Sequence, residues 1–107
     1  MNHTITSFQR AVYAATSAIP RGKVTTYQLL AARIGCGSPR AVGQALKRNP
    51  FAPKVPCHRV ISTDLAIGGF SGKRTGANIT RKVRMLAAEG VAFTRGRLAD
   101  PKRVYRF

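Results

Sequence analysis

Apolar residues recur at helical spacing near the N-terminus of the chain. Four of them fall at i, i+4, i+7 and i+11, on one face of a helix: Phe8, Val12, Ala15 and Ile19. Ser7 is a suitable cap for the first turn, so the pattern predicts a helix from Ser7 through Ala18. The proline and glycine within residues 19–22 are expected to end it.

Two shorter helical patterns follow, separated by a glycine turn. Residues 25–28 have capping-box spacing, and the helix that they begin ends at Gly35, with an apolar face of Leu29, Leu30 and Ile34. The second helix takes Ser38 as its cap and Pro39 in its first turn, and runs through Lys47 to the next Asn-Pro step. Two short helices across a glycine turn predict a helix-turn-helix.

The second half of the chain is less periodic. The prolines of residues 51–56 predict an extended segment, because a residue before proline avoids the helical region. Residues 68–78 predict a glycine-rich loop. The helix after it covers about residues 80–89, ends at Gly90 and has an inward face with Val83 and Leu86. The tail alternates weakly, and residues 104–107 predict a short strand or an ordered end.

These elements predict a mainly α fold with a winged-helix-like helix-turn-helix core and short strands. The length of 107 residues suits one domain, so we expect residues 1–107 to form a single unit. Hydrophobic residues make up 44% of the chain, which is typical of a folded domain rather than a disordered basic tail.

The charge balance is unusual for such a domain. The chain has 19 Lys and Arg against 3 Asp and Glu, a formal net charge of +16. Self-repulsion of this size favours an anionic partner, and nucleic acid is the leading one. An anionic membrane surface is a weaker alternative, because the sequence has no basic amphipathic helix with a large apolar face. There is also no apolar stretch of about 18 residues and no signal-peptide pattern, so we expect an intracellular protein with no membrane partner.

Two cysteines carry the first candidate chemistry. Cys36 and Cys57 lack the spacing of a metal site, so we expect no bound metal and two free thiols. Basic residues surround Cys57, namely Lys54, His58 and Arg59, and a positive potential favours the nucleophilic thiolate. A free cysteine is more often a buried small hydrophobe, and both interpretations stay open at this point.

A histidine and a glutamate could assist this thiol. Neighbouring residues of an extended chain point to opposite faces, so His58 needs a bridging water or a turn to reach the cysteine. Glu89 ends a predicted helix, where the helix dipole disfavours a carboxylate, so we expect local compensation. It could orient a histidine as the acid of a triad does, or form a surface ion pair with Arg81 or Arg84.

The second helix of the helix-turn-helix has features of a DNA-contacting surface. Its small residues Ala41, Gly43 and Ala45 permit close approach of another backbone, and Arg40 stands at its N-terminal end. Arg40 is open to a second interpretation, as one more phosphate contact beside Arg33, Lys47 and Arg48. Tyr27 is likewise open to a core role.

Five motifs in order carry a family resemblance: GKVTTYQLLAARIG, RAVGQALKRNP, PCHRVI, GGFSG and LAAEG. From about Phe8 to about Gly90 the chain resembles the C-terminal domain of the methylated-DNA-protein-cysteine methyltransferases, the O6-alkylguanine-DNA alkyltransferases. The resemblance implies a methyltransferase that acts on double-stranded DNA containing O6-alkylguanine. It implies no cofactor and no metal, and a single turnover, because the thioether product is not cleaved.

The resemblance also implies catalytic roles. Cys57 accepts the alkyl group. His58 deprotonates the Cys57 thiol through a water, and Glu89 orients His58. Asn49 braces the turn between the helix-turn-helix and the cysteine segment. The hydroxyl of Tyr27 hydrogen-bonds the guanine and aids its departure.

Further residues follow from the same resemblance. The flipped base is expected in a pocket lined by Tyr27, Leu46, Val60, Phe70 and Ser71. Arg40 matches the arginine that takes the place of the extruded nucleotide. The remaining expected DNA contacts are Ala41, Gly43, Gln44, Ala45, Lys47, Arg48, Thr25 and Thr26. We expect a monomer, with a repair protein as a possible further partner.

Two alternatives remain beside alkyl transfer. The family's usual N-terminal domain has no counterpart here, which resembles the short alkyltransferase-like proteins that bind alkylated guanine without repairing it and recruit other repair factors. Those proteins typically have tryptophan or alanine at the position of Cys57, so the thiol favours transfer. A generic basic helix-turn-helix protein is the weakest alternative, because it does not explain GGFSG and LAAEG.

Overall fold

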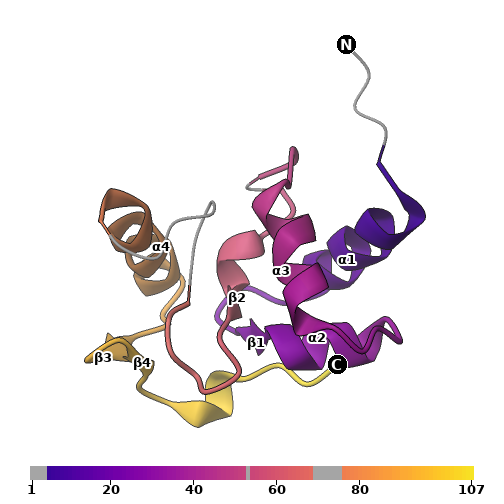
Figure 1. The fold of residues 1–107 in the computed structure, drawn as a ribbon. Helices are drawn as coiled ribbons and strands as arrows, with labels where there is room; N and C mark the ends of the chain where they lie inside the picture. Colours follow the sequence, from indigo (N-terminus) through magenta and orange to yellow (C-terminus); the bar gives the residue numbers. More distant parts are fainter. Residues whose placement is uncertain (1–4, 53, 69–75) are drawn as a thin grey trace.

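Three helices pack together in the first half of the computed structural model, which describes residues 5–52, 54–68 and 76–107. They are α1 (Ser7–Ser17), α2 (Tyr27–Arg33) and α3 (Pro39–Lys47) (Figure 1). Their apolar faces meet in a core cluster made of Val12, Tyr13, Ile19, Leu30, Ala31, Val42, Ala45, Leu46, Val55 and Val60. The predicted mainly helical fold is confirmed.

The start of α1 differs from the prediction by its cap. Thr6, not Ser7, is the N-cap: its hydroxyl accepts a hydrogen bond from the backbone N–H of Gln9 at 3.0 Å. The Gln9 side chain in turn accepts from the backbone N–H of Thr6 at 3.0 Å. This capping box satisfies two otherwise free backbone N–H donors. If Ser7 were the cap, the residue in the reciprocal position would be Arg10, whose side chain has no hydrogen-bond acceptor.

The helix-turn-helix is present, with one cap moved. Thr26, not Thr25, caps α2 by accepting from the backbone N–H of Leu29 at 3.1 Å. Gly35 has a φ of +70° in the turn, which favours glycine. Ser38 caps α3 as predicted, accepting from the N–H of Ala41 at 3.1 Å. In α2 the buried residues are Leu30 and Ala31, while the predicted Leu29 and Ile34 are half-buried.

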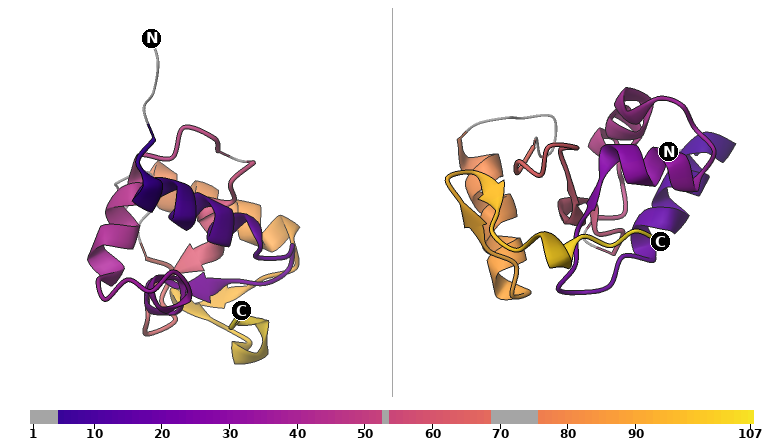
Figure 2. Two further views of the ribbon diagram at one scale, coloured as in Figure 1. Left: turned by 90° about the vertical axis from the view of Figure 1, so that its right-hand side faces the viewer. Right: turned by 90° about the horizontal axis from the view of Figure 1, so that it is seen from below.

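A short parallel strand pair joins the two halves of the fold. β1 (Thr25–Thr26) pairs with β2 (Val60–Ile61), and the left view of Figure 2 shows the two strands side by side. Val60 faces the first core cluster, whereas Ile61 faces a second cluster with Val24, Leu86, Val91 and Leu98. Successive strand residues point to opposite sides, so β2 belongs to both cores.

The second half is built on α4 (Ala77–Ala88), which begins three residues before the predicted start because Gly76 is its N-cap. It ends at Glu89, and Gly90 follows with a φ of +86°, as predicted. A hairpin of β3 (Phe93–Thr94) and β4 (Arg97–Leu98) packs beside it. A 3₁₀ helix, η2 (Pro101–Arg103), leads to Val104, which bridges to Val24 in parallel and confirms an ordered end.

The proline-rich approach to the cysteine is a turn rather than an extended segment. The backbone N–H of Val55 donates to the carbonyl of Phe51 at 3.0 Å, which closes one helical turn. A second turn, the 3₁₀ helix η1 (Cys57–Arg59), follows directly. Proline lacks a backbone N–H and therefore excludes long helices here. It does not prevent single turns in which the backbone N–H of another residue is the donor. None of the described helices is long and apolar enough to cross a membrane.

Candidate active site

The turn η1 presents Cys57 at the junction of the two halves. The backbone N–H of Cys57 donates to the carbonyl of Val55 at 2.8 Å, and Cys57's own carbonyl accepts from the N–H of Val60. The side chain is a half-buried free thiol. A 3₁₀ helix turns by about 120° per residue, so His58 leaves the turn in a different direction from Cys57 without opposing it.

His58, Arg59 and Glu89 form a buried ionic cluster. Nε2 of His58 lies 2.8 Å from Oε2 of Glu89, and the His58 residue is only 3% exposed. Arg59 donates from Nε to Oε1 of Glu89 at 2.8 Å and from Nη2 to Oε2 at 3.0 Å, while its Nη1 donates to the carbonyl of Ile19 at 2.9 Å. The two arms of this guanidinium hold the carboxylate in a fixed orientation.

This cluster answers the question that Glu89 raised in the sequence. The carboxylate does end a helix, as the C-cap of α4, and Arg59 supplies the expected compensation for the helix dipole. The alternative of a surface pair with Arg81 or Arg84 is wrong, because the Glu89 side chain is 7% exposed and faces His58 and Arg59.

The cluster fixes the proton on His58. Burial lowers the pKa of His58 below its ordinary value, and the hydrogen bond and charge of Glu89 oppose only part of that shift. Burial would raise the pKa of Glu89, but the hydrogen bonds from Arg59 and His58 lower it overall. An ionised carboxylate only accepts, so neutral His58 carries its proton on Nε2 and keeps a basic lone pair on Nδ1.

Tyr27 lies between two glycines at the start of α2. A Cβ atom at Gly43 of α3 would lie 3.9 Å from Cε1 of Tyr27, and one at Gly68 would lie 3.6 Å from Cε2. At Gly68 that Cβ would also lie 2.9 Å from Oγ of Ser62, and the φ of Gly68 is +71°. The tight contact is with Ser62, so Gly68 permits a close approach of the chain to Ser62, while a Cβ there would be in ordinary van der Waals contact with the tyrosine ring.

Asn49 ties the end of α3 to the cysteine segment. Its Nδ2 donates to the carbonyl of Val55 at 3.0 Å, and its Oδ1 accepts from the backbone N–H of Phe51 at 2.9 Å. Since Val55 also accepts from Cys57, one carbonyl joins Asn49 to the turn that holds the thiol. These contacts are those of a residue that braces this turn.

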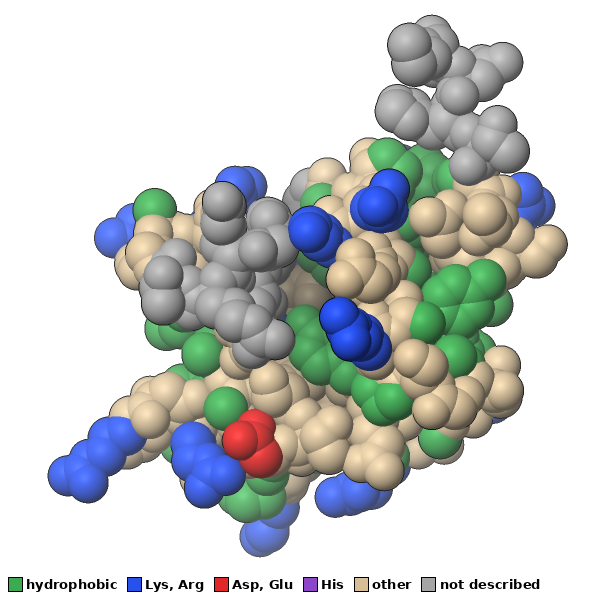
Figure 3. Space-filling model, viewed as in Figure 1, with side chains coloured by type: hydrophobic (Ala, Val, Ile, Leu, Met, Phe, Trp, Pro, Cys, Tyr) green, Lys and Arg blue, Asp and Glu red, His purple; other side chains and the backbone are tan. Residues whose placement is uncertain are grey.

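The predicted DNA-contacting residues divide between surface and interior. Exposed residues of α3 and its C-cap are Arg40, Gln44, Lys47 and Arg48, and Ala41 and Gly43 are half-buried. Figure 3 shows Lys and Arg side chains spread over the face of the molecule that carries α3. Three predicted contacts are corrected by their burial, because their side chains lie in the interior: Thr25, Thr26 and Ala45.

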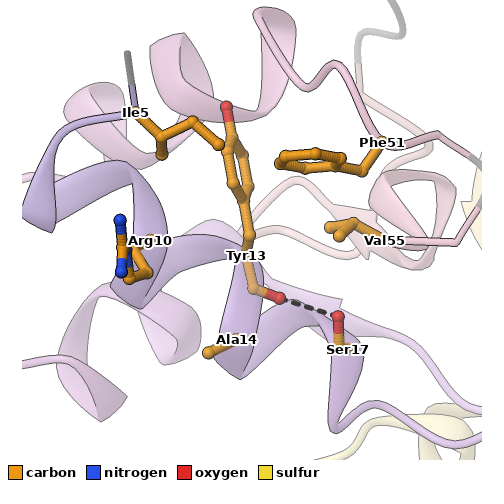
Figure 4. A pocket seen from close by; sticks show the side chains of 7 residues that line it. All are labelled: Ile5, Arg10, Tyr13, Ala14, Ser17, Phe51 and Val55. Atoms are coloured by element: carbon orange, nitrogen blue, oxygen red, sulfur yellow. Dashed lines mark hydrogen bonds between the residues drawn. The ribbon is translucent and has the colours of Figure 1, made fainter. Parts of the chain in front are cut away.

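Parts of the predicted base pocket lie within the described structure. Leu46 and Val60 are buried in the first core cluster, against which Tyr27 packs. Phe70 and Ser71 lie outside the described residues. A groove of about 320 Å³ on the surface of α1 is a separate feature, because Tyr27, Leu46 and Val60, the predicted pocket residues that the structure describes, do not line it. Figure 4 shows its lining, with Tyr13 and Phe51 in edge-to-face contact beside Val55.

Sequence reasoning named Arg59 only as a basic neighbour of Cys57, and it missed Lys82. Arg59 holds Glu89, and no local pattern distinguishes it from the other arginines. Lys82 of α4 is fully buried, and its Nζ donates to the carbonyls of Val60 at 2.8 Å and Ile67 at 2.7 Å. A signal for Lys82 existed: it lies seven residues before Glu89, and thus on the same helix face, in line with the apolar Leu86. Within the described ranges, no three His, Cys, Asp or Glu side chains group as metal ligands do.

Known proteins share these features of sequence. Residues 7–91 match the family described as 6-O-methylguanine DNA methyltransferase, DNA binding domain. A methylated-DNA–protein-cysteine methyltransferase of Methanothermobacter thermautotrophicus is 47% identical over 87 residues, which are 81% of this chain and 46% of that protein. Its namesake in Salmonella typhimurium is 44% identical over 86 residues, 79% of this chain and 47% of that protein. The chain thus spans about half the length of the curated relatives that it matches.

Solved structures resemble it as well. The Mycobacterium tuberculosis O6-methylguanine methyltransferase superimposes with a TM-score of 0.66 at 42% identity, over 82% of this chain and 51% of that one. S. pombe Atl1, in complex with damaged DNA containing O6-carboxymethylguanine, superimposes with a TM-score of 0.81 at 32% identity. That match covers 96% of this chain and 98% of Atl1.

Proposed function

Because the chain belongs to the O6-methylguanine DNA methyltransferase family, whose DNA-binding domain it matches, we propose that it repairs alkylated DNA. Cys57 takes the alkyl group from O6 of an alkylated guanine. The observation that carries this proposal is the hydrogen bond between buried His58 and Glu89, because His58 directly follows the half-buried Cys57 in the turn η1.

The chemistry begins with the thiol. Nδ1 of His58 takes the proton of Cys57 through a bridging water, and Glu89 stabilises the imidazolium through Nε2. The thiolate then attacks the alkyl carbon. One sulfur–carbon bond forms as the carbon–O6 bond breaks. The departing guanine takes up the proton that the thiol lost. The net products are a thioether and guanine.

DNA must deliver the base to this thiol. O6 of guanine is buried in the stacked duplex, so the base must be flipped out, at a cost of a few kcal/mol. The net charge of +16 supplies phosphate contacts that offset this cost. Arg40, exposed in the first turn of α3, fills the vacancy in the duplex, and Tyr27 faces the extruded guanine.

The stoichiometry of repair tests the proposal. Protein is incubated with an excess of duplex containing O6-methylguanine, and the restored guanine is counted over time. We expect a plateau of one guanine per protein, because the thioether is not cleaved, and no restored guanine with Cys57→Ser. Continued turnover beyond the plateau would contradict the single use of Cys57, and equal repair by the Cys57→Ser variant would contradict its role as the acceptor.

A second function has its own support, the match to almost the full length of Atl1. In this case the protein senses alkylated guanine without repairing it, and a repair protein is its further partner. Tight binding to alkylated duplex would survive Cys57→Ser, and the lesion would be recovered unchanged. For either function we propose a monomer, which size-exclusion chromatography with light scattering measures directly.

A further inference from the structure

The β3–β4 hairpin lies outside the part of the chain that matches the family, which ends at residue 91. It is nevertheless a firm part of the fold. Leu98 is buried in the second core cluster, against which Phe93 also packs, and β4 forms an antiparallel bridge to Ala66. The hairpin belongs neither to the catalytic cluster nor to the predicted base pocket, so the proposed chemistry does not explain it.

Backbone hydrogen bonds fix the hairpin to the chain segment 64–67. The N–H of Ile67 donates to the carbonyl of Gly96, in the turn of the hairpin, at 2.9 Å. The N–H of Leu98 donates to the carbonyl of Leu65 at 2.8 Å. These bonds hold both the turn and the second strand, so the tip of the hairpin has a fixed place on the molecule.

The tip of the hairpin has a residue that its backbone conformation disfavours. Thr94 pairs with Arg97, which leaves Arg95 and Gly96 as a two-residue turn. Both have positive φ, +53° and +78°, as in a type I′ turn, whose first position favours Asn, Asp or Gly. Other residues in the left-handed region are uncommon, and they cluster at sites that bind ligands. The turn therefore keeps an arginine against its local preference.

The positive charge at this tip is largely unbalanced. Arg95 is exposed, and no hydrogen bond or ion pair joins its guanidinium to another residue that the structure describes. The Arg97 side chain is 65% exposed, and its Nη2 lies 3.9 Å from the Asp64 carboxylate, a surface pair that neutralises little charge. Figure 3 shows Lys and Arg side chains at the end of the molecule that carries β3 and β4 as well as over α3. The two basic regions thus share one face.

We infer that this hairpin is a second DNA-contacting surface, an inference that takes its partner from the proposed function. Arg95 and Arg97 bind phosphates of the duplex away from the flipped base, while α3 contacts the DNA at the lesion. Guanidinium groups suit this role, because each has several N–H donors and a permanent charge that match phosphate oxygens. A fixed tip also loses less conformational freedom on binding than a free loop does. The hairpin therefore adds affinity without reading the base sequence.

The salt dependence of binding to an undamaged duplex tests this inference. It is measured for the wild type, for Arg95→Asn and for Lys102→Gln, a control that removes an exposed charge from η2. Loss of one phosphate contact should reduce the slope of log K against log salt concentration by about 0.9 in Arg95→Asn and leave the control unchanged. Asparagine suits the turn, so the melting temperature of Arg95→Asn should equal or exceed that of the wild type. Equal slopes for Arg95→Asn and the wild type would overturn the inference.

A footprint on the DNA backbone locates the contact. In a Cys57→Ser background, which keeps the lesion intact, the protein is bound to a duplex with one central O6-methylguanine, and the DNA is cleaved with hydroxyl radicals. We expect Arg95→Asn to lose protection at one edge of the footprint and to keep protection at the lesion. A footprint identical to that of the Arg95 parent would refute the contact and leave the hairpin free for an acidic protein instead.

The two proposals fail separately. Neither measurement depends on methyl transfer, so an absence of transfer alongside the reduced slope and the shortened footprint refutes the proposed function and leaves the hairpin contact established. Methyl transfer with an unchanged slope and an unchanged footprint refutes the inference about the hairpin alone.

Discussion

Removing the charge of Glu89, while keeping its shape, probes the buried cluster most sharply. In Glu89→Gln, Arg59 loses a carboxylate that accepts two of its hydrogen bonds, at 2.8 and 3.0 Å. A hydrogen bond to a charged group contributes about 1.5–3 kcal/mol, and leaving one buried charge unpaired costs about 3–5 kcal/mol. The glutamine oxygen still accepts one bond, so we expect a loss of about 3 kcal/mol in the free energy of unfolding.

The same change weakens transfer by a different route. His58 loses the charge that stabilises its imidazolium, and general base catalysis contributes about 10²- to 10⁴-fold to rates. We therefore expect the single-turnover rate of methyl transfer to fall at least about a hundredfold. Binding to the alkylated duplex should remain, since Glu89 lies inside the protein and faces no DNA.

Chemical denaturation measures the first effect, and rapid-quench counting of restored guanine measures the second. Asp64→Asn is the matched control, because Asp64 forms an exposed pair with Arg97 at 3.9 Å. Surface pairs of this kind contribute about 0–1 kcal/mol. If Glu89→Gln and Asp64→Asn have equal stability and equal transfer rates, the cluster neither supports the fold nor orients His58.

Three further predictions concern a glycine, the DNA surface and pH. Gly68→Ala should destabilise the protein by about 1–3 kcal/mol more than Gly96→Ala in denaturant titrations, because both glycines have positive φ but only the Cβ at position 68 would crowd other atoms, Oγ of Ser62 at 2.9 Å and its backbone N at 3.3 Å; equal losses would disprove the close approach of Gly68 to Ser62. Arg40→Ala should slow lesion repair far more than Lys47→Ala, which should mainly reduce the salt dependence of binding, and equal effects would make Arg40 a simple phosphate contact. Because the pKa of His58 is lowered in the folded state, the unfolded chain binds its proton first on acidification, so the melting temperature should fall as the pH drops below about 6.5 and should do so less in His58→Gln.

Local signals in the sequence were sufficient for the helix-turn-helix. Ser38 followed by Pro39 marks a helix start, and Gly35 marks the preceding stop, because capping and positive φ are properties of the few residues involved. The error at Ser7 is of the same local kind. Two neighbouring residues could each cap α1, and the reciprocal side chain at Gln9 favours Thr6.

The site was less predictable, because its contacts join segments distant in sequence. The helix dipole showed that Glu89 needs compensation, but only the fold shows that Arg59 and His58 provide it. A charged Lys82 is expected on a surface, and its burial depends on the two carbonyls that accept from it. The turns between residues 51 and 59 were hidden by prolines that suggest extended chain.

The fate of the methyl group tests the central claim most directly. After incubation with duplex DNA containing O6-methylguanine, the protein is digested and the mass of the peptide with Cys57 is measured, with the peptide of Cys36 as an internal control. The account predicts a gain of one methyl group on Cys57 and none on Cys36. An unmodified Cys57 in protein that holds the alkylated duplex would contradict transfer and leave the molecule as a sensor of the lesion.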